Sequence, residues 1–445
     1  MIRSILIANR GEIAARIIKT AKKMNIGSVA VYSDADRGAS FLLEADETVC
    51  IGGNTPLESY LDSAKIIAAA VSHGCDAIHP GYGFLAENSL FVEQCREAGL
   101  IFVGPDAEAI RLMGDKERAR QTAQEFGLPT VPGSGIVKTP EEIRTVCDHL
   151  GYPVLLKASA GGGGIGMRKV DNAENLAQAF SETTDRAGVA FGDRRVYVEK
   201  YLEEPHHIEI QVLRDEHGGL LTFYERECSV QRRYQKVIEE SPSTSVNPEL
   251  RQQLRDAARM LIEGIGYINA ATVEFIVDRE HKFYFLEANT RLQVEHPVTE
   301  AITGLDLVEL QIRIASGEKL SMDESTLPIK GWALEARIYA EDPHRFYPSP
   351  GTITVYREPD GEKVRVDSGY STRGMLTPYY DPLIAKLITW GNNRDEAICH
   401  MLQALDNYQI EGIKTNIPFL QEAIASPLFR AGGYDTHFVE KLRAN

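Results

Sequence analysis

A row of charged and amide residues that alternate strictly with other residues near position 290 constrains this chain more than any other feature. The row is Glu287, Asn289, Arg291, Gln293 and Glu295, and Leu286, Ala288, Leu292 and Val294 fall on the other parity. Because every second side chain of an extended segment shares a face, the pattern predicts a strand with charged groups on one side and core groups on the other. A solvated edge strand would more naturally carry Lys, Thr and Ser. Such a row can hold a divalent cation at one end and a small anion at the other, which indicates phosphate chemistry.

A second carboxylate lies on the strand expected just before this row. Glu274 falls in the apolar run 271–277, Glu287 falls in the run 283–288, and a tight turn over 278–281 separates them. The two runs should pair as a hairpin and bring both carboxylates together. Neighbouring acids repel unless a cation intervenes, and Mg²⁺ prefers one or two carboxylates plus phosphate oxygens. We therefore expect a divalent cation between these two side chains.

Composition narrows the class of protein. The chain has 445 residues, 43% hydrophobic and 25% charged, which is an ordinary profile for about two to four globular domains. A net charge of −16 without a Lys/Arg run argues against a nucleic-acid partner. No apolar run approaches the ~20 residues that span a bilayer, so no membrane association is expected. The six cysteines show no metal-site spacing, which favours reduced thiols in a cytoplasmic protein.

The first hundred residues alternate between strand-like and helix-like segments. Apolar runs at 5–8, 28–32, 77–79 and 101–103 alternate with helical patterns at 12–23, 60–71 and 89–98. This order predicts βαβ units and a parallel, Rossmann-like sheet in a domain over residues 1–114. The loops 9–12 and 79–88 follow strands of that sheet, and ligands bind beyond the carboxyl ends of such strands.

The remaining chain divides at two stretches rich in Pro and Gly. We expect a domain over 115–330 that contains a mobile lid over 131–202, since a hinge-like stretch lies at 128–133. A break at 327–331 begins a C-terminal β-rich domain over 331–445. Its predicted strands lie at 333–339, 351–356 and 383–390, with a helix at 394–406. The predicted fold class is thus mixed α/β and α+β.

Four consecutive glycines, Gly161–Gly164, follow a predicted strand that ends in Lys157. Glycine lets a backbone approach a ligand closely and turn N–H groups toward it, as a polyphosphate requires. The run fits G-x-G-x-x-G, but a strand rather than a helix follows it at Met167, which argues against a dinucleotide fold. No Lys-Ser/Thr follows the last glycine, so it is not a Walker A loop. We expect a strand–loop–strand flap over phosphates, assisted by Lys157 and Lys116.

Several motifs together identify the chain as resembling a known family. The glycine loop, the early lysines and the acids Glu274 and Glu287 resemble an ATP-grasp enzyme. The segments IANRGEIA at 7–14, HPGYGFL at 79–85, CSVQRR at 228–233, QKVIEE at 235–240 and NTRLQVEHP at 289–297 narrow the resemblance to biotin carboxylase. The resemblance covers essentially the whole chain. It extends to IEGIKTN at 410–416, which is typical of stand-alone bacterial subunits.

The resemblance implies a reaction and a set of site residues. Bicarbonate would attack ATP to form carboxyphosphate, and the released CO₂ would be transferred to biotin N1′. Glu295, Arg291, Lys236 and Arg337 would be catalytic, with Glu295 as the base and Arg337 stabilising the biotin enolate. Bicarbonate would contact Lys236, Arg291, Gln293, Val294 and Glu295; biotin would contact Tyr82 and Arg337; Mg²⁺ or Mn²⁺ would bind Glu274, Glu287 and Asn289. ATP would contact Lys116, Lys157, Gly162, Gly163, Gly164, Ile165, Gly166, Met167, Glu199, Lys200, Tyr201, Leu202, His207, Gln231, Tyr234, Glu274 and Glu287.

Structural explanations exist for some of these residues. His207 could cap a buried strand, Arg337 could be an ordinary ion-pair partner, and Tyr82 could be a packing residue. Two positions depart from the family pattern. Many relatives carry Arg or Lys where this chain has Ile165, and many carry His where it has Tyr234. Tyr can donate a hydrogen bond but adds no charge near neutral pH.

No Ala/Val-Met-Lys-Met biotinylation motif occurs in the sequence. By resemblance, we expect biotin on a separate carrier protein, carboxyltransferase subunits as further partners, and a homodimer. Acetyl-CoA is the expected final acceptor, and propionyl-CoA, pyruvate and urea stay open. Two other hypotheses are an ATP-grasp enzyme that activates another carboxylate and a catalytically silent nucleotide-binding subunit.

Overall fold

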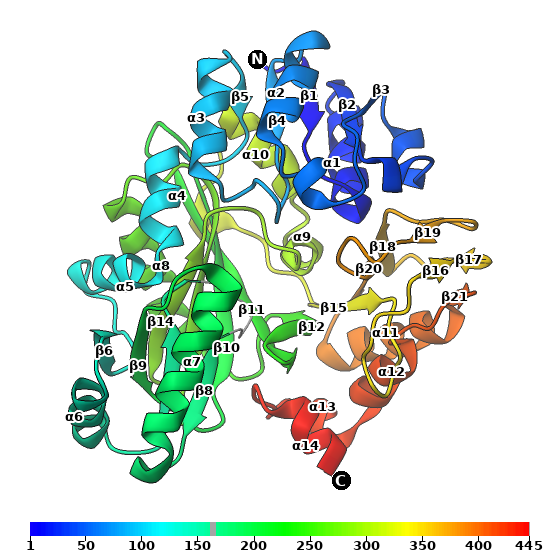
Figure 1. Ribbon diagram of the computed structural model, residues 1–445. Coiled ribbons are helices and arrows are strands. Elements are labelled where there is room, and N and C mark those ends of the chain that lie inside the picture. Colours follow the sequence, from blue (N-terminus) through cyan, green and yellow to red (C-terminus); the bar gives the residue numbers. More distant parts are fainter. Residues whose placement is uncertain (161–165, 445) are drawn as a thin grey trace.

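The computed structural model describes residues 1–160 and 166–444, arranged around three sheets of four or more strands (Figure 1). The N-terminal sheet has the order β3-β2-β1-β4-β5 and is parallel throughout. Its strands are β1 (Ser4–Ile7), β2 (Gly27–Tyr32), β3 (Glu47–Cys50), β4 (Ala77–His79) and β5 (Ile101–Phe102). Its helices are α1 (Gly11–Lys23), α2 (Ser63–Ser72) and α3 (Ser89–Glu97). The predicted parallel α/β region is confirmed. β3 escaped prediction because its side chains are mostly exposed and lack an apolar run.

The predicted ligand loops lie side by side at the point where the strand order reverses. β1 and β4 are neighbours in the sheet, so the loops that follow them meet at its carboxyl edge. The Asn9 side-chain amide fixes this contact by donating to the carbonyls of Pro80 and Tyr82, each at 2.7 Å. The loops therefore form a braced wall of any site that opens there.

Helices α4 (Ala107–Gly114) and α5 (Lys116–Glu125) lead into a small unit over residues 131–202. Its antiparallel sheet has the order β6-β9-β7-β8, and α6 and α7 pack against it. The elements are β6 (Gly133–Val137), α6 (Pro140–Leu150), β7 (Val154–Ala158), β8 (Met167–Val170), α7 (Leu176–Phe191) and β9 (Val196–Lys200). The strands expected on either side of the glycine run are confirmed, since β7 pairs directly with β8, while residues 161–165 between them lie outside the described residues. The small unit has its own apolar core, which includes Val154, Leu156 and Val198.

The largest sheet has the order β14-β13-β10-β11-β12-β15-β20-β18. Its strands are β10 (His206–Arg214), β11 (Leu220–Arg232), β12 (Gln235–Ser241), β13 (Asn269–Val277), β14 (Phe283–Asn289), β15 (Trp332–Tyr339), β18 (Val364–Ser368) and β20 (Leu383–Gly391). β12 pairs with β15 through Ile238 and Ala336, so the sheet runs on across residue 330. The C-terminal region is therefore built onto the sheet that carries the predicted acids.

Further helices and short strands lie around this sheet. They are α8 (Pro248–Gly264), α9 (His296–Thr303), α10 (Leu307–Ala315), β16 (Gly351–Thr352), β17 (Val355–Arg357), β19 (Met375–Leu376), α11 (Arg394–Asn407), β21 (Gln409–Glu411), α12 (Ile417–Ala425), α13 (Pro427–Arg430) and α14 (Phe438–Ala444). The single strand predicted at 351–356 is wrong, because the chain there forms β16 and β17 with different partners. Within residues 1–160 and 166–444, no helix combines the length and apolar character needed to cross a membrane.

The prediction of one strand through Glu295 is also wrong. β14 ends at Asn289, and residues 290–295 form an irregular connection before α9. The Thr290 N–H donates to a Glu87 carboxylate oxygen at 3.1 Å instead of continuing the ladder. Pro297 lies in the first turn of α9, where its missing N–H costs no helical bond, so the chain there favours a helix start. The alternating polar residues thus belong to a strand and to a loop.

Candidate active site

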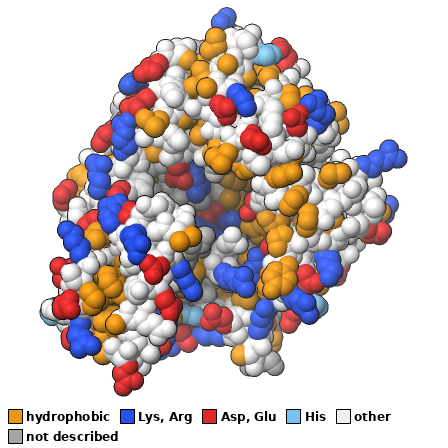
Figure 2. Space-filling model, in the orientation of Figure 1, with side chains coloured by type: hydrophobic (Ala, Val, Ile, Leu, Met, Phe, Trp, Pro, Cys, Tyr) orange, Lys and Arg blue, Asp and Glu red, His pale blue; other side chains and the backbone are white. Residues whose placement is uncertain are grey.

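Two adjoining cavities lie along the large sheet. The first lies between it and the small unit, and the second lies between it and the N-terminal loops. Both are lined by His207, Tyr234, Glu274 and Glu287, so these side chains stand at the boundary. Figure 2 shows a hollow near the centre of the face in view, with acidic and basic side chains inside it. A large ligand in the first cavity could therefore meet a small one in the second.

The first cavity gathers most of the predicted ATP-binding residues. It is lined by Lys116, Lys157, Met167, Glu199, Lys200, Tyr201, Leu202, His207, Gln231, Tyr234, Glu274 and Glu287. Gly162, Gly163, Gly164 and Ile165 lie outside the described residues. The described Gly166 joins the flap to β8 at a left-handed φ of 83° but does not line this cavity. The prediction therefore selected residues that are distant in sequence and close in space.

Two lysines of this cavity are held by carboxylates that face it. The Lys157 ammonium donates to Glu199 at 2.8 Å, from β7 to the adjacent β9. Burial alone would lower the pKa of Lys157, but Glu199 raises it well above its ordinary value. The Lys116 ammonium lies 3.5 Å from Glu287, and both side chains are partly exposed. Each lysine could thus exchange its carboxylate for a phosphate group.

The C-terminal segment supplies two lining residues that the sequence did not suggest. Thr436 and His437 line the first cavity although they lie more than 200 residues after Tyr201. The Thr436 N–H donates to the Pro205 carbonyl at 3.0 Å, and the Tyr201 hydroxyl lies 2.7 Å from His437 Nε2. Neither residue belongs to a charged or glycine-rich motif. No local signal could have revealed them.

Glu274 lies at the centre of the boundary between the cavities. One carboxylate oxygen accepts hydrogen bonds from Lys236 at 2.9 Å, Asn289 at 2.8 Å and Gln293 at 2.9 Å. The other lies 2.6 Å from His207 Nε2. Burial would raise the pKa of Glu274, but Lys236 and His207 bring it well below its ordinary value. Glu274 is therefore an anion.

Both ring nitrogens of His207 have hydrogen-bond partners in the site, so the residue is not only the cap of a buried strand. Its Nδ1 lies 2.7 Å from the Gln231 amide nitrogen, whose orientation is supported by a bond from the same nitrogen to the Cys228 carbonyl at 2.9 Å. An amide N–H can only donate, so Nδ1 accepts and Nε2 carries the proton directed at Glu274. Gln231 thus sets the tautomer of His207.

Lys236 joins three buried carboxylates from three strands or loops. Its ammonium donates to Glu209 at 2.6 Å, Glu274 at 2.9 Å and Glu295 at 2.6 Å. Burial would lower the pKa of Lys236, but the three acids raise it well above its ordinary value. Glu209, which also pairs with Arg226, was not predicted. Glu295, the last residue of the predicted polar row, and Glu274, on the strand before that row, therefore share one cation.

Glu295 lies between two cations and is inaccessible to solvent in this structure. One oxygen accepts from Lys236, and the other accepts from Arg337 at 2.9 Å. Burial would raise the pKa of Glu295, but Lys236 and Arg337 lower it well below its ordinary value. Arg337 also donates to Glu239 at 2.6 Å, and burial raises the pKa of Glu239 to about 7 despite that contact. Glu239 is a second acid that the sequence motifs did not single out.

Arg291 extends the row toward the N-terminal region. It donates to Glu87 at 2.7 Å, to the Asn289 side-chain oxygen at 3.0 Å and to the Gln293 side-chain oxygen at 3.1 Å. Glu87, in the loop 79–88 that was expected beyond a strand of the N-terminal sheet, therefore contacts the site directly. The second cavity is lined by all the predicted bicarbonate and biotin contacts: Tyr82, Lys236, Arg291, Gln293, Val294, Glu295 and Arg337. A small anion there would meet cations at more than one edge.

The predicted metal set fits in part. Glu274 and Glu287 are directly opposed in the β13–β14 hairpin, as predicted, and both face the cavities. Two carboxylates beside a phosphate-binding cavity suit Mg²⁺. The Asn289 side-chain oxygen, by contrast, accepts from Arg291. His207, Glu209 and Glu274 also lie within ligating distance of one another, but the Lys236 ammonium already contacts both acids.

The fold and the pair of adjoining cavities are those of an ATP-grasp protein. The biotin carboxylase N-terminal domain matches residues 1–110, and the biotin carboxylase C-terminal domain matches residues 335–441. The ATP-binding domain of the carbamoyl-phosphate synthase L chain matches residues 115–323. The chain belongs to the biotin carboxylase family.

Individual relatives cover nearly the whole chain. Biotin carboxylase 1 of Bacillus subtilis is 49% identical, over 99% of this chain and 98% of its own length. A pyruvate carboxylase subunit from Methanothermobacter thermautotrophicus is 50% identical, over 100% of this chain and 90% of its own. The structure is similar to the biotin carboxylase domain dimer of Hydrogenobacter thermophilus 2-oxoglutarate carboxylase, solved with MgADP, ADP and bicarbonate. The TM-score is 0.96 and the identity 46%, over 99% of this chain and 98% of that one.

Proposed function

We propose that this protein carboxylates N1′ of biotin in a reaction that consumes ATP and bicarbonate. The first cavity would hold the nucleotide and the second the bicarbonate anion, and they are called the nucleotide cavity and the anion cavity below. The observation that carries the proposal is the Lys236 ammonium, which contacts Glu274 at the boundary of the two cavities and Glu295 in the anion cavity. A relative of nearly the same length was solved with MgADP and bicarbonate together. The geometry therefore suits two ligands that react with each other.

In the first step, a bicarbonate oxygen forms a bond to the γ-phosphorus of ATP, and the bond from that phosphorus to ADP breaks. Glu295 accepts the bicarbonate proton, and Arg291 and Lys236 hold the anion. Bicarbonate would compete with Glu295 for Lys236, which would raise the basicity of the carboxylate. Glu274 and Glu287 would hold Mg²⁺, which when bound neutralises phosphate charge. The products are ADP and carboxyphosphate.

In the second step, carboxyphosphate breaks its carbon–oxygen bond to give CO₂ and phosphate. Phosphate removes the proton from biotin N1′, and the resulting ureido enolate attacks the carbon of CO₂. Arg337 would stabilise the negative oxygen of that enolate, since a fixed cation acts most strongly where charge develops. Tyr82 lines the same cavity and would contact biotin.

We further propose that biotin arrives on a separate carrier protein and that carboxyltransferase subunits use the product. Acetyl-CoA is the default acceptor. The relative from Methanothermobacter thermautotrophicus, which belongs to a pyruvate carboxylase, keeps pyruvate as an alternative, and propionyl-CoA and urea remain alternatives by resemblance. The small unit over 131–202 would close over ATP as a lid. Slower amide exchange in β8 on adding nucleotide would support closure, and unchanged exchange would count against it.

The direct test follows labelled bicarbonate into biotin. Purified protein, MgATP, free biotin and ¹³C-bicarbonate should yield carboxybiotin whose new carbonyl carbon carries the label. ADP should form in equal amount once biotin is saturating. Label found in another carboxylate, or absent while ATP is hydrolysed, would contradict the proposal.

A further inference from the structure

We propose that Lys386 is a positioning residue for residues 290–295, the turn that contains most of the predicted bicarbonate contacts. It would fix this turn through the Val294 carbonyl. This inference rests on the proposed function. Lys386 lies on β20, is fully buried, and does not line either cavity of the site. Its ammonium donates to the Val294 carbonyl oxygen at 2.9 Å. That carbonyl belongs to the peptide that joins Val294 to Glu295, the proposed base.

The turn needs such support because it lacks a strand partner. Residues 290–295 follow the end of β14 and precede α9. Glu87 holds the beginning of this segment, through the Thr290 N–H at 3.1 Å and Arg291 at 2.7 Å. Lys386 holds its end. The two contacts come from distant parts of the chain, and the segment that they hold contains four of the residues predicted to contact bicarbonate: Arg291, Gln293, Val294 and Glu295.

Lys386 and Arg337 act on Glu295 in complementary ways. They are directly opposed on β20 and β15, so their side chains leave the sheet on the same face. Arg337 binds the Glu295 carboxylate at 2.9 Å, and Lys386 binds the main chain immediately before it. One cation therefore orients the functional group, and the other fixes the backbone from which that group projects.

The surroundings of Lys386 differ from those of an ordinary buried ion pair. Its nearest acid, Glu12 at the start of α1, lies 3.2 Å away, and neither Glu12 oxygen has a hydrogen-bond partner among the described residues. The nearby Glu335 of β15 likewise has two buried oxygens without such a partner in the described chain. The hydrogen bond of the ammonium is thus directed to the turn, while Glu12 supplies charge from the N-terminal region.

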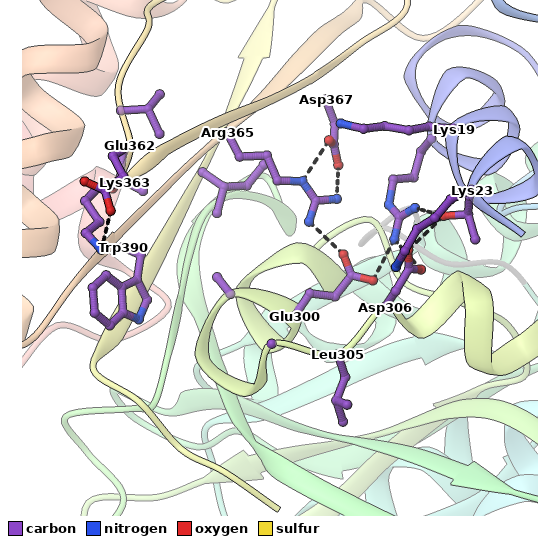
Figure 3. Close-up of a pocket in the computed structure, with 17 residues that line it drawn as sticks. Lys19, Lys23, Glu300, Leu305, Asp306, Glu362, Lys363, Arg365, Asp367 and Trp390 are labelled. Atoms are coloured by element: carbon purple, nitrogen blue, oxygen red, sulfur yellow. Dashed lines mark hydrogen bonds and ion pairs between the residues drawn. The ribbon is translucent and has the colours of Figure 1, made fainter.

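The same sheet face holds a contrasting cation at Arg365 of β18. Figure 3 shows Arg365 between Asp367 and Glu300, and its nitrogens lie 2.6 Å and 2.7 Å from their carboxylates. Glu300 in turn accepts from Arg16 at 2.7 Å. Arg365 is therefore satisfied by side chains of a separate cavity. The variant Arg365→Met therefore removes a cation from this face of the sheet but removes no contact to the turn, so it serves as the control.

The test compares Lys386→Met with Arg365→Met in the full chain. For Lys386→Met, kcat/KM for bicarbonate should fall about 10- to 10²-fold, since small misplacements of reacting groups have effects of that size. KM for ATP should stay within about twofold of the wild-type value. The kcat of each variant should be divided by the fraction of protein that binds nucleotide, so that unfolded protein does not count as lost activity. Arg365→Met should lower Tm without changing the bicarbonate constant. An equal loss in the ATP and bicarbonate constants, or no loss in either, would overturn the proposal.

A second variant keeps the test decisive if Lys386→Met does not fold. The double variant Glu12→Gln/Lys386→Met removes the ion pair as a whole, so no buried acid is left without its cation. Relative to Glu12→Gln alone, which keeps the contact to Val294, kcat/KM for bicarbonate should still fall about tenfold while KM for ATP holds. An unchanged bicarbonate constant would overturn the positioning role. Wild-type protein whose ATP hydrolysis ignores bicarbonate would instead refute the proposed function itself, which separates the two failures.

Discussion

The nucleotide cavity and the anion cavity share a wall but differ in how their charges are satisfied. In the nucleotide cavity, Lys116 and Glu287 are 25% and 34% exposed and stand 3.5 Å apart. In the anion cavity, Glu295 is 0% exposed and binds both Lys236 and Arg337 within 3 Å. The Lys116–Glu287 pair is open to an incoming phosphate, and the more buried Lys157 of the same cavity would exchange its carboxylate partner, Glu199, for one. The set in the anion cavity is already assembled, so its ligand would exchange contacts rather than create them.

This difference predicts whether a mutation should lower the reaction rate or weaken ligand binding. Preorganised charges stabilise a transition state without rearrangement, so changes in the anion cavity should lower rates. Open charges gain partners only when the ligand arrives, so changes in the nucleotide cavity should weaken binding. Four predictions would break or sharpen this contrast.

The largest effect is expected from Glu295→Gln. The amide cannot accept the bicarbonate proton, and it leaves Lys236 and Arg337 without their shared anion. Bicarbonate-dependent turnover should fall at least ~10²-fold, the usual scale for losing a catalytic base. Nucleotide affinity, measured by titration calorimetry, should change little. Glu324→Gln, which removes a partly buried acid paired with Arg255 and Arg259, is the matched control. Comparable losses in both variants would show a general structural effect.

Arg337→Ala should lower biotin carboxylation by about 10²-fold, because the enolate loses its cation. The expected readout is carboxybiotin formed per unit time at saturating ATP and bicarbonate. Near-normal turnover would mean that Arg337 serves as an ion-pair partner of Glu239 and Glu295 and has no role toward biotin.

Lys157→Met addresses the nucleotide cavity. It should weaken ATP binding about tenfold, which corresponds to one lost charge contact with a phosphate. The turnover number at saturating ATP should fall much less. Lys138→Met, on an exposed position of the same small unit, controls for the change of net charge. A large loss of turnover with unchanged affinity would erase the distinction between the two cavities.

The smallest effect concerns pH and Glu12, a buried acid in the wall of the anion cavity. Burial raises the pKa of Glu12 from 4.5 to about 7, although Lys386 opposes the rise. An acid with a raised folded-state pKa contributes stability that is present below its ordinary pKa and is lost as pH rises through the folded value. Thermal stability should therefore fall between pH 5 and pH 8, and in Glu12→Gln this fall should be smaller by about 2 °C. Calorimetric melting curves at both pH values would show it, and an identical fall would contradict the assignment.

The contacts that the sequence predicts correctly are those between neighbouring segments of the chain. Glu274 and Glu287 lie on adjacent strands joined by a tight turn, so their pairing follows from short-range register. The flap between β7 and β8 likewise depends on neighbouring segments. Motifs from distant parts of the chain, such as the one holding Lys236, were placed by their resemblance to a family and not by geometry.

The residues that sequence reasoning missed depend on long-range packing. Glu209 lies in the apolar-rich strand β10, and Glu239 lies in the quoted segment 235–240 without a predicted role; both gain meaning only because Lys236 and Arg337 reach them. Thr436 and His437 reach the nucleotide cavity through the docking of the C-terminal segment on Pro205. The strand predicted through Glu295 failed because alternation reports which side chains face together, whereas Glu87 and Pro297 determine where pairing stops.

Steady-state ATP hydrolysis by the purified wild-type protein tests the central claim most directly. Because Lys236 joins the two cavities, hydrolysis should require bicarbonate and Mg²⁺ together and should rise when free biotin is added. Hydrolysis at the same rate in bicarbonate-free buffer would contradict the account, since it would mean that the assembled charges around Glu295 serve no captured anion.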